Sequence, residues 1–193
     1  MTLPAPGFAD PVAQSQSAFR ALLDATARPG TLVALPPPDG AAEGLSVAQA
    51  AIALALLDGD TPVWLAPGCA AARGWIAFHT GAPATPDPKR ARFAFCGRID
   101  ETPDPGFFDL GSDAYPDRST TLVVETPGLA ATGGFVLSGP GIAGTARAHL
   151  PLSDRFLTAR AGLSELFPRG LDILLTDGAR AMALPRTTFV ERN

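Results

Sequence analysis

Four stretches of the chain are typical of helices. The first has clear ends, because Asp10 before Pro11 is a favoured N-cap with proline at the first helical position, and the sequence RPG follows Ala27. The second starts with a capping box, Ser46-x-x-Gln49, ahead of an almost entirely apolar run that indicates a buried helix. The predicted helices cover residues 11–27, 47–57, 69–79 and 153–166.

Shorter stretches that alternate between apolar and polar residues, or that are rich in β-branched residues, are typical of strands. The last two are joined by Asp177-Gly178, which is a turn signal for an antiparallel hairpin. Strands are predicted over residues 31–36, 61–66, 91–96, 120–126, 133–138, 171–177 and 179–185. The interleaving predicts one α/β domain over residues 1–193, with a mixed sheet flanked by helices.

Composition and charge exclude several classes of protein. With 46% hydrophobic and 18% charged residues, the chain is typical of a globular domain. Its longest apolar run, residues 50–57, is far shorter than the roughly 20 residues of a membrane span. The first basic residue is Arg20, so we expect no signal peptide and a cytoplasmic protein. A net charge of -4, with no basic run longer than Lys89-Arg90, argues against a nucleic-acid partner.

The residues that most often carry chemistry are few. Cys69 and Cys96 are too few for a disulfide framework, and His79 and His149 lack metal-ligand spacing, so we expect reduced thiols and no metal. His79 ends an apolar helix, where a histidine is more often a C-terminal cap than a catalytic base. Lys89, the only lysine, lies between prolines and arginines in an expected solvated loop, which predicts that no pyridoxal phosphate is bound.

A glycine-rich segment after the strand at 133–138 matches the dinucleotide-binding pattern G-x-G-x-x-G at Gly139, Gly141 and Gly144. Pro140 removes one backbone donor, and Pro151 would interrupt a helix leading out of the loop. A tight strand-to-strand turn that needs glycine backbone angles is therefore the favoured interpretation. Exposed N–H groups over 139–142 could still hold a phosphate if an arginine converges on them.

Arginines beside rigid turns are the best ligand candidates, because a fixed guanidinium suits phosphate or phosphonate oxygens. They are Arg28, Arg118, Arg169 and Arg186. For any one of them, an ordinary surface ion pair is the favoured interpretation. No catalytic constellation is visible in the sequence.

The long segment 97–118 is too irregular for a regular element and long enough to be functional. Its large side chains Phe107, Phe108 and Tyr115 are typical of an interface, so we expect the loop 106–118 to contact a second copy or a partner subunit. Phe107 and Phe108 could instead fold back onto the domain.

Six segments, in register over nearly the whole chain, resemble the PhnH family, the H subunit of the bacterial carbon-phosphorus lyase system. They are FADPVAQSQSAFRALLDATARPG, LLDGDTPVWL, FHTGAP, GSDAYPDRSTTLVVE, LSGPGI and FPRGLDILL with ALPRTT. Gly111-Ser112 and Asp117 depart from the family pattern, which usually has Gly-Thr and Glu there.

This resemblance implies a fold similar to the large domain of pyridoxal phosphate-dependent transferases, without the cofactor. It also implies a homodimer that joins the G, I and J subunits in a core complex with lyase or transferase activity. That complex exchanges the adenine of ATP for an alkylphosphonate and gives ribose 1-alkylphosphonate 5-triphosphate. The expected function is an essential accessory subunit. The alternative is a stand-alone enzyme or binding protein for a phosphorylated ligand, acting through Arg28, Arg118 or Arg186.

Overall fold

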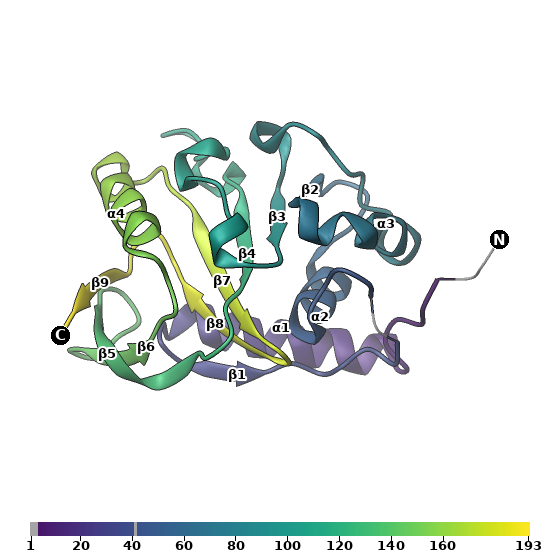
Figure 1. Cartoon of the computed structure of the whole chain (residues 1–193), viewed down its shortest axis with the longest axis horizontal. Helices are drawn as coiled ribbons and strands as arrows, with labels where there is room; N and C mark the ends of the chain where they lie inside the picture. The colour runs from purple at the N-terminus through teal and green to yellow at the C-terminus, as the bar shows by residue number, and fades with distance from the viewer. Residues whose placement is uncertain (1–3, 41) are drawn as a thin grey trace.

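A six-stranded mixed sheet forms the centre of the protein in a computed structural model, which describes residues 4–40 and 42–193. The strand order is β1-β8-β7-β4-β3-β2, and a smaller sheet has the order β6-β5-β9. The pairs β2–β3, β3–β4 and β4–β7 are parallel, whereas β8 is antiparallel to both of its neighbours. The small sheet and α4 lie at one end of the molecule, and α2 and α3 lie toward the other (Figure 1).

The α-helices are α1 (Pro11–Ala27), α2 (Val47–Leu56), α3 (Arg73–Thr80) and α4 (Asp154–Gly162). The strands are β1 (Leu32–Ala34), β2 (Val63–Leu65), β3 (Phe93–Cys96), β4 (Thr121–Glu125), β5 (Ala130–Ser138), β6 (Ala146–His149), β7 (Asp172–Asp177), β8 (Arg180–Leu184) and β9 (Phe189–Arg192). Short 3-10 turns are η1 (Pro67–Ala72), η2 (Pro88–Arg90), η3 (Ile99–Glu101), η4 (Pro105–Phe107), η5 (Pro116–Arg118) and η6 (Leu163–Leu166).

The central sheet separates two hydrophobic cores, because successive side chains of a strand point to opposite faces. In β4, Val123 packs into the core that α1 and α2 cover, whereas Leu122 and Val124 pack into the other one. The second core is closed by the loop after β3, by the small sheet and by α4, which contributes Phe156. The α/β class with a mixed sheet is therefore confirmed.

The predicted helix ends agree well with the structure. The Asp10 side chain accepts a hydrogen bond from the Ala13 N–H, and both hydrogen bonds of the Ser46/Gln49 capping box are present. The helix predicted over 69–79 is instead η1 followed by α3, because Pro67 starts a helical turn two residues earlier. The helix predicted over 153–166 is α4 and η6.

All seven predicted strands are found, and Asp177-Gly178 does join an antiparallel hairpin, β7–β8. The sequence analysis missed β6 and β9, so the small sheet is a new finding. Both strands are four residues long with mostly exposed or half-buried side chains, which leaves almost no alternating pattern to detect. Within the described ranges, no helix is both long and apolar enough to span a membrane.

Candidate functional site

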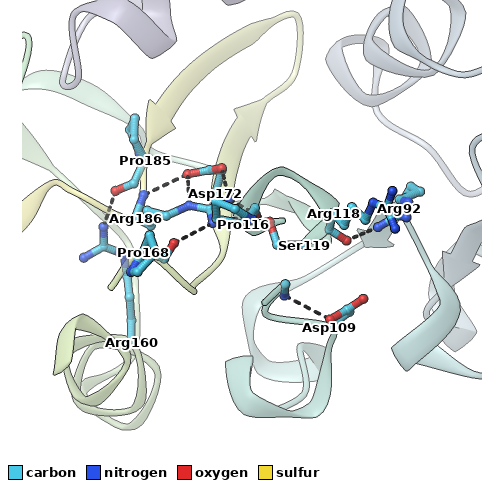
Figure 2. A network of polar contacts seen from close by, with 11 residues as sticks. Arg92, Asp109, Pro116, Arg118, Ser119, Arg160, Pro168, Asp172, Pro185 and Arg186 are labelled. Carbon is cyan, nitrogen blue, oxygen red and sulfur yellow. Dashed lines mark hydrogen bonds and ion pairs between the residues drawn. The ribbon is translucent and has the colours of Figure 1, made fainter. Parts of the chain in front are cut away.

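Arg186, in the segment that connects β8 to β9, lies at the centre of a polar network (Figure 2). Its Nε and Nη2 form a two-pronged ion pair with Asp172 at the start of β7, with an Nη2–Oδ2 distance of 2.6 Å. Nη2 also donates to the Ser119 hydroxyl at 2.7 Å, and Nη1 donates to the carbonyls of Pro116 and Pro168 at 2.9 and 3.1 Å. The network joins the end of the long loop, the segment before β7 and the end of β8.

These contacts use all five N–H donors of the Arg186 guanidinium. The side chain is only 14% exposed. Arg186 therefore has a structural role in this network, and the ligand role that the sequence suggested for it stays a prediction.

A second guanidinium, that of Arg160, reaches up from α4 beside this network (Figure 2). Its Nη2 donates to the carbonyls of Pro185 and Thr188 at 2.8 and 2.9 Å. Across residues 4–40 and 42–193, no carboxylate forms an ion pair with it. Burial lowers the pKa of Arg160 to about 10, and the charge of Asp172 partly offsets this effect, so the side chain is still a cation at neutral pH.

The Arg160 side chain lines a hollow of about 130 Å³ between α4, η6 and β9. Ser164, Arg186, Thr188 and Phe189 are also in its lining. A neighbouring hollow of about 210 Å³ shares three of these residues and adds Pro140 of the glycine-rich segment and Arg169. Arg169 lies 3.3 Å from the exposed carboxylate of Asp113. This group of arginines around two hollows is the candidate site.

Sequence analysis missed Arg160, although the signal was present. Arg160 lies four residues after Phe156, three after Leu157 and three before Leu163, on the apolar face of the predicted helix. An arginine in that position must either bury its charge or have a special partner.

The glycine-rich segment joins β5 to the antiparallel strand β6, so it is a strand-to-strand turn and not a dinucleotide-binding loop. It is tightly packed: a Cβ on Gly139 would lie 2.5 Å from the Thr187 carbonyl oxygen, and one on Gly141 would lie 2.1 Å from that of Ala27. The Ile142 N–H donates to the Gly139 carbonyl within the turn. Close backbone packing therefore explains these two glycines, and a ligand role for either stays a prediction.

The other two arginines of the ligand prediction lie apart from the hollows. Arg28 is exposed and pairs with Asp24 one helical turn earlier, at 3.0 Å. The Arg118 guanidinium stacks on the exposed Tyr115 ring, 4.0 Å from its centroid, and its backbone carbonyl accepts a hydrogen bond from Arg92. Both are consistent with ordinary surface interactions, which typically contribute less than about 1 kcal/mol.

The aromatic residues of the long loop divide into two kinds. Phe107 and Tyr115 are both 51% exposed, whereas Phe108 is fully buried and its ring packs edge-on against Trp64. The expected interface role of Phe108 is therefore corrected: it has folded back into the core, where an aromatic ring buries most surface.

The remaining candidates have structural contacts. His79 contacts the Ala5 carbonyl oxygen at 2.9 Å, and exposed Lys89 donates to the carbonyls of Gly106 and Phe108 at 2.8 and 2.5 Å. Burial raises the pKa of the Cys69 and Cys96 thiols to about 12, with nearby acidic residues adding to the effect, which keeps both unreactive. In the part of the chain that the structure describes, no three His, Cys, Asp or Glu residues could hold a metal ion.

Fold and site together define an α/β protein with an arginine-lined hollow between α4, η6 and β9. The chain belongs to the PhnH family: the family described as bacterial phosphonate metabolism protein (PhnH) matches residues 6–191. A relative from Rhizobium meliloti (strain 1021) is 45% identical over 188 residues, which cover 96% of this chain and 94% of the relative. That relative is named alpha-D-ribose 1-methylphosphonate 5-triphosphate synthase subunit PhnH.

Proposed function

We propose that this protein is an accessory subunit of a ribose 1-methylphosphonate 5-triphosphate synthase complex in phosphonate catabolism. The observation that carries the proposal is the 45% identity, along almost the whole chain, to a protein named as the PhnH subunit of that synthase. The arrangement of the site supports an accessory role, because its arginines are held by backbone carbonyls and carboxylates rather than beside a nucleophile and a base.

The finer parts of this proposal follow from the family resemblance. The protein would act in the cytoplasm as a homodimer that joins the G, I and J subunits. The lyase or transferase activity would belong to the complex, which replaces the adenine of ATP with an alkylphosphonate. The fold would be a relative of the pyridoxal phosphate-dependent transferases that works without that cofactor and without a metal.

Deletion of the gene should abolish growth on methylphosphonate as the sole phosphorus source and leave growth on inorganic phosphate unchanged. The reason is that a missing subunit blocks the synthase before any phosphorus is released. Growth curves in both media measure the effect, and the plasmid-borne gene should restore growth. Normal growth of the deletion strain on methylphosphonate would contradict the proposed function.

Assembly with other chains would use exposed apolar surface, and two such areas contain residues that can be tested singly. One is the loop 106–118, through Phe107 and Tyr115. The other is a hollow of about 250 Å³ beside α1, lined by Phe19, Leu23 and Leu174 among others, with Phe19 51% and Leu23 58% exposed. Large exposed apolar side chains that gather in this way commonly mark protein–protein contacts.

The loop can be tested with Phe107→Ser, because this side chain is exposed and its loss should leave the melting temperature unchanged. We expect the variant to recover less of the partner subunits, or less homodimer, than the wild type in co-purification and light-scattering experiments. Leu23→Ser tests the α1 area in the same way, with the exposed Arg20→Gln as its control. Full assembly of Phe107→Ser would exclude the loop, whereas Phe108 is unsuitable because its removal would open the core.

The alternative function, a stand-alone enzyme for a phosphorylated ligand, keeps one supporting observation: the hollow beside Arg160. Incubation of the purified chain alone with ATP and methylphosphonate distinguishes the accessory-subunit function from the stand-alone function. Release of adenine without any other subunit would favour the alternative.

A further inference from the structure

Arg160 is a cation with too few partners for its degree of burial. Its half-buried guanidinium has two carbonyl contacts, both through Nη2. No hydrogen bond among the described residues uses its Nη1 or Nε, and Nε is shielded from water. A buried charge without an opposite charge in contact costs free energy, so such a group is usually paired in the working protein.

Among the described residues, the other buried polar atoms without a hydrogen bond lie in this hollow or in the neighbouring one. Three buried side-chain polar atoms in the described residues lack a hydrogen bond, namely Arg160 Nε, Thr188 Oγ1 and Arg169 Nε, of which Arg169 Nε has an ion-pair contact with Asp113 at 3.3 Å. Thr188 is only 2% exposed, and it lines the hollow together with Arg160. Buried polar groups are nearly always satisfied in native structures, so a cluster of exceptions indicates that something else completes the site.

The hollow has the size and charge for a small anion. Its volume of about 130 Å³ exceeds the roughly 10–15 Å³ that one water molecule needs. None of the described acidic residues near the hollow pairs with Arg160. Asp172 is paired with Arg186, Asp113 lies beside Arg169, and Glu191 in the lining is exposed to solvent. The positive charge of Arg160 is therefore left without a partner.

We propose that this hollow binds a small tetrahedral oxyanion, a phosphate or phosphonate group, through the Arg160 guanidinium and the Thr188 hydroxyl. Nη1 of Arg160 carries two N–H donors that no protein acceptor among the described residues uses, and these donors and the Thr188 hydroxyl can each donate to an oxygen of such a group. Ser164, whose hydroxyl now donates to the Ala161 carbonyl at 2.7 Å, lies at the rim. This site does not depend on the proposed function.

A free oxyanion fits better than a carboxylate from a partner chain, because the unpartnered atoms are recessed. Arg160 Nε and Thr188 Oγ1 are shielded from water in this structure, so a ligand reaches them only after small side-chain rotations inside the hollow. A compact ion can follow such rotations, whereas a side chain from a flat partner surface has to protrude into the hollow.

Titration of the full chain with inorganic phosphate, at constant ionic strength against chloride, tests the proposal by calorimetry and thermal shift. We expect saturable binding and a higher melting temperature. Arg160→Gln should weaken phosphate binding about tenfold or more, because it removes a charged hydrogen-bonding partner. Arg155→Gln, which removes an exposed charge from the same helix, should bind phosphate like the wild type.

Thr188→Val keeps the test decisive if Arg160→Gln does not fold. The substitution removes a hydroxyl that has no partner, so without phosphate the melting temperature should stay equal or rise, while phosphate affinity should fall several-fold. Methylphosphonate in place of phosphate shows whether three oxygens suffice for binding.

Absence of saturable binding to the wild type, or equal binding by all variants, would overturn the proposal. Loss of partner subunits from Arg160→Gln, without phosphate binding to the wild type, would assign the hollow to a carboxylate of another chain.

Discussion

Substitution of Gly141 by alanine is expected to lower the free energy of unfolding by about 3–5 kcal/mol. Two independent costs add up at this position. Its φ of +84° is unfavourable for any residue with a Cβ, and the new Cβ would lie 2.1 Å from the Ala27 carbonyl oxygen and 3.0 Å from Pro29. Because the obstacles are the backbone of Ala27, the last residue of α1, and the ring of Pro29 just after it, the strand-to-strand turn has to move as a whole. Urea unfolding followed by circular dichroism measures the loss.

Gly144→Ala is the matched control. Gly144 lies in the same turn with a φ of +77°, but a Cβ there would meet nothing within 4 Å. It should therefore show only the backbone cost of about 1–2 kcal/mol. Equal losses for the two variants would mean that the close approach to Ala27 has no energetic importance.

Arg186→Met is expected to cost about 2–4 kcal/mol, somewhat below the range for a fully buried ion pair because Asp172 is 39% exposed. Methionine keeps an unbranched apolar side chain but leaves Asp172, Ser119 and two carbonyl oxygens without their donor. The three segments that the guanidinium joins should loosen first, which hydrogen exchange of the segment 116–119 can detect.

Arg28→Met provides the comparison for this prediction. Arg28 also pairs with an aspartate, but its side chain and that of Asp24 are 61% and 60% exposed, so its removal should change stability by no more than about 0.5 kcal/mol. A similar loss for both variants would show that the Arg186 network is no stronger than a surface ion pair.

Local signals in the sequence predicted most regular elements of this fold. The caps at Asp10 and Ser46 and the turn at Asp177-Gly178 are contacts between near neighbours, so the sequence displays them directly. The strands β6 and β9 were not predicted, because their partner, β5, supplies most of the buried apolar surface of the small sheet.

The candidate site was harder to predict, because its arginines are distinguished by distant partners. Arg186 and Arg28 both stand beside prolines in the sequence, yet one binds groups up to 70 residues away and the other binds only its own helix. Phe107 and Phe108 are adjacent, yet only Phe108 is buried, where its ring contacts Trp64 in the second core. Such differences depend on tertiary contacts that local patterns do not contain.

The position of β8 and β9 also affects how the chain can fold during its synthesis. The N-terminal strand β1 pairs with β8, with Leu32 opposite Met182, and β5 pairs with β9, with Phe135 opposite Arg192. Until β8 and β9 have left the ribosome, β7 and β5 each present an unpaired edge, and unpaired edges promote contact with other nascent chains. A premature stop just before Arg180 would make that exposure permanent, so a truncated product should aggregate or be degraded rather than accumulate as a shorter folded protein.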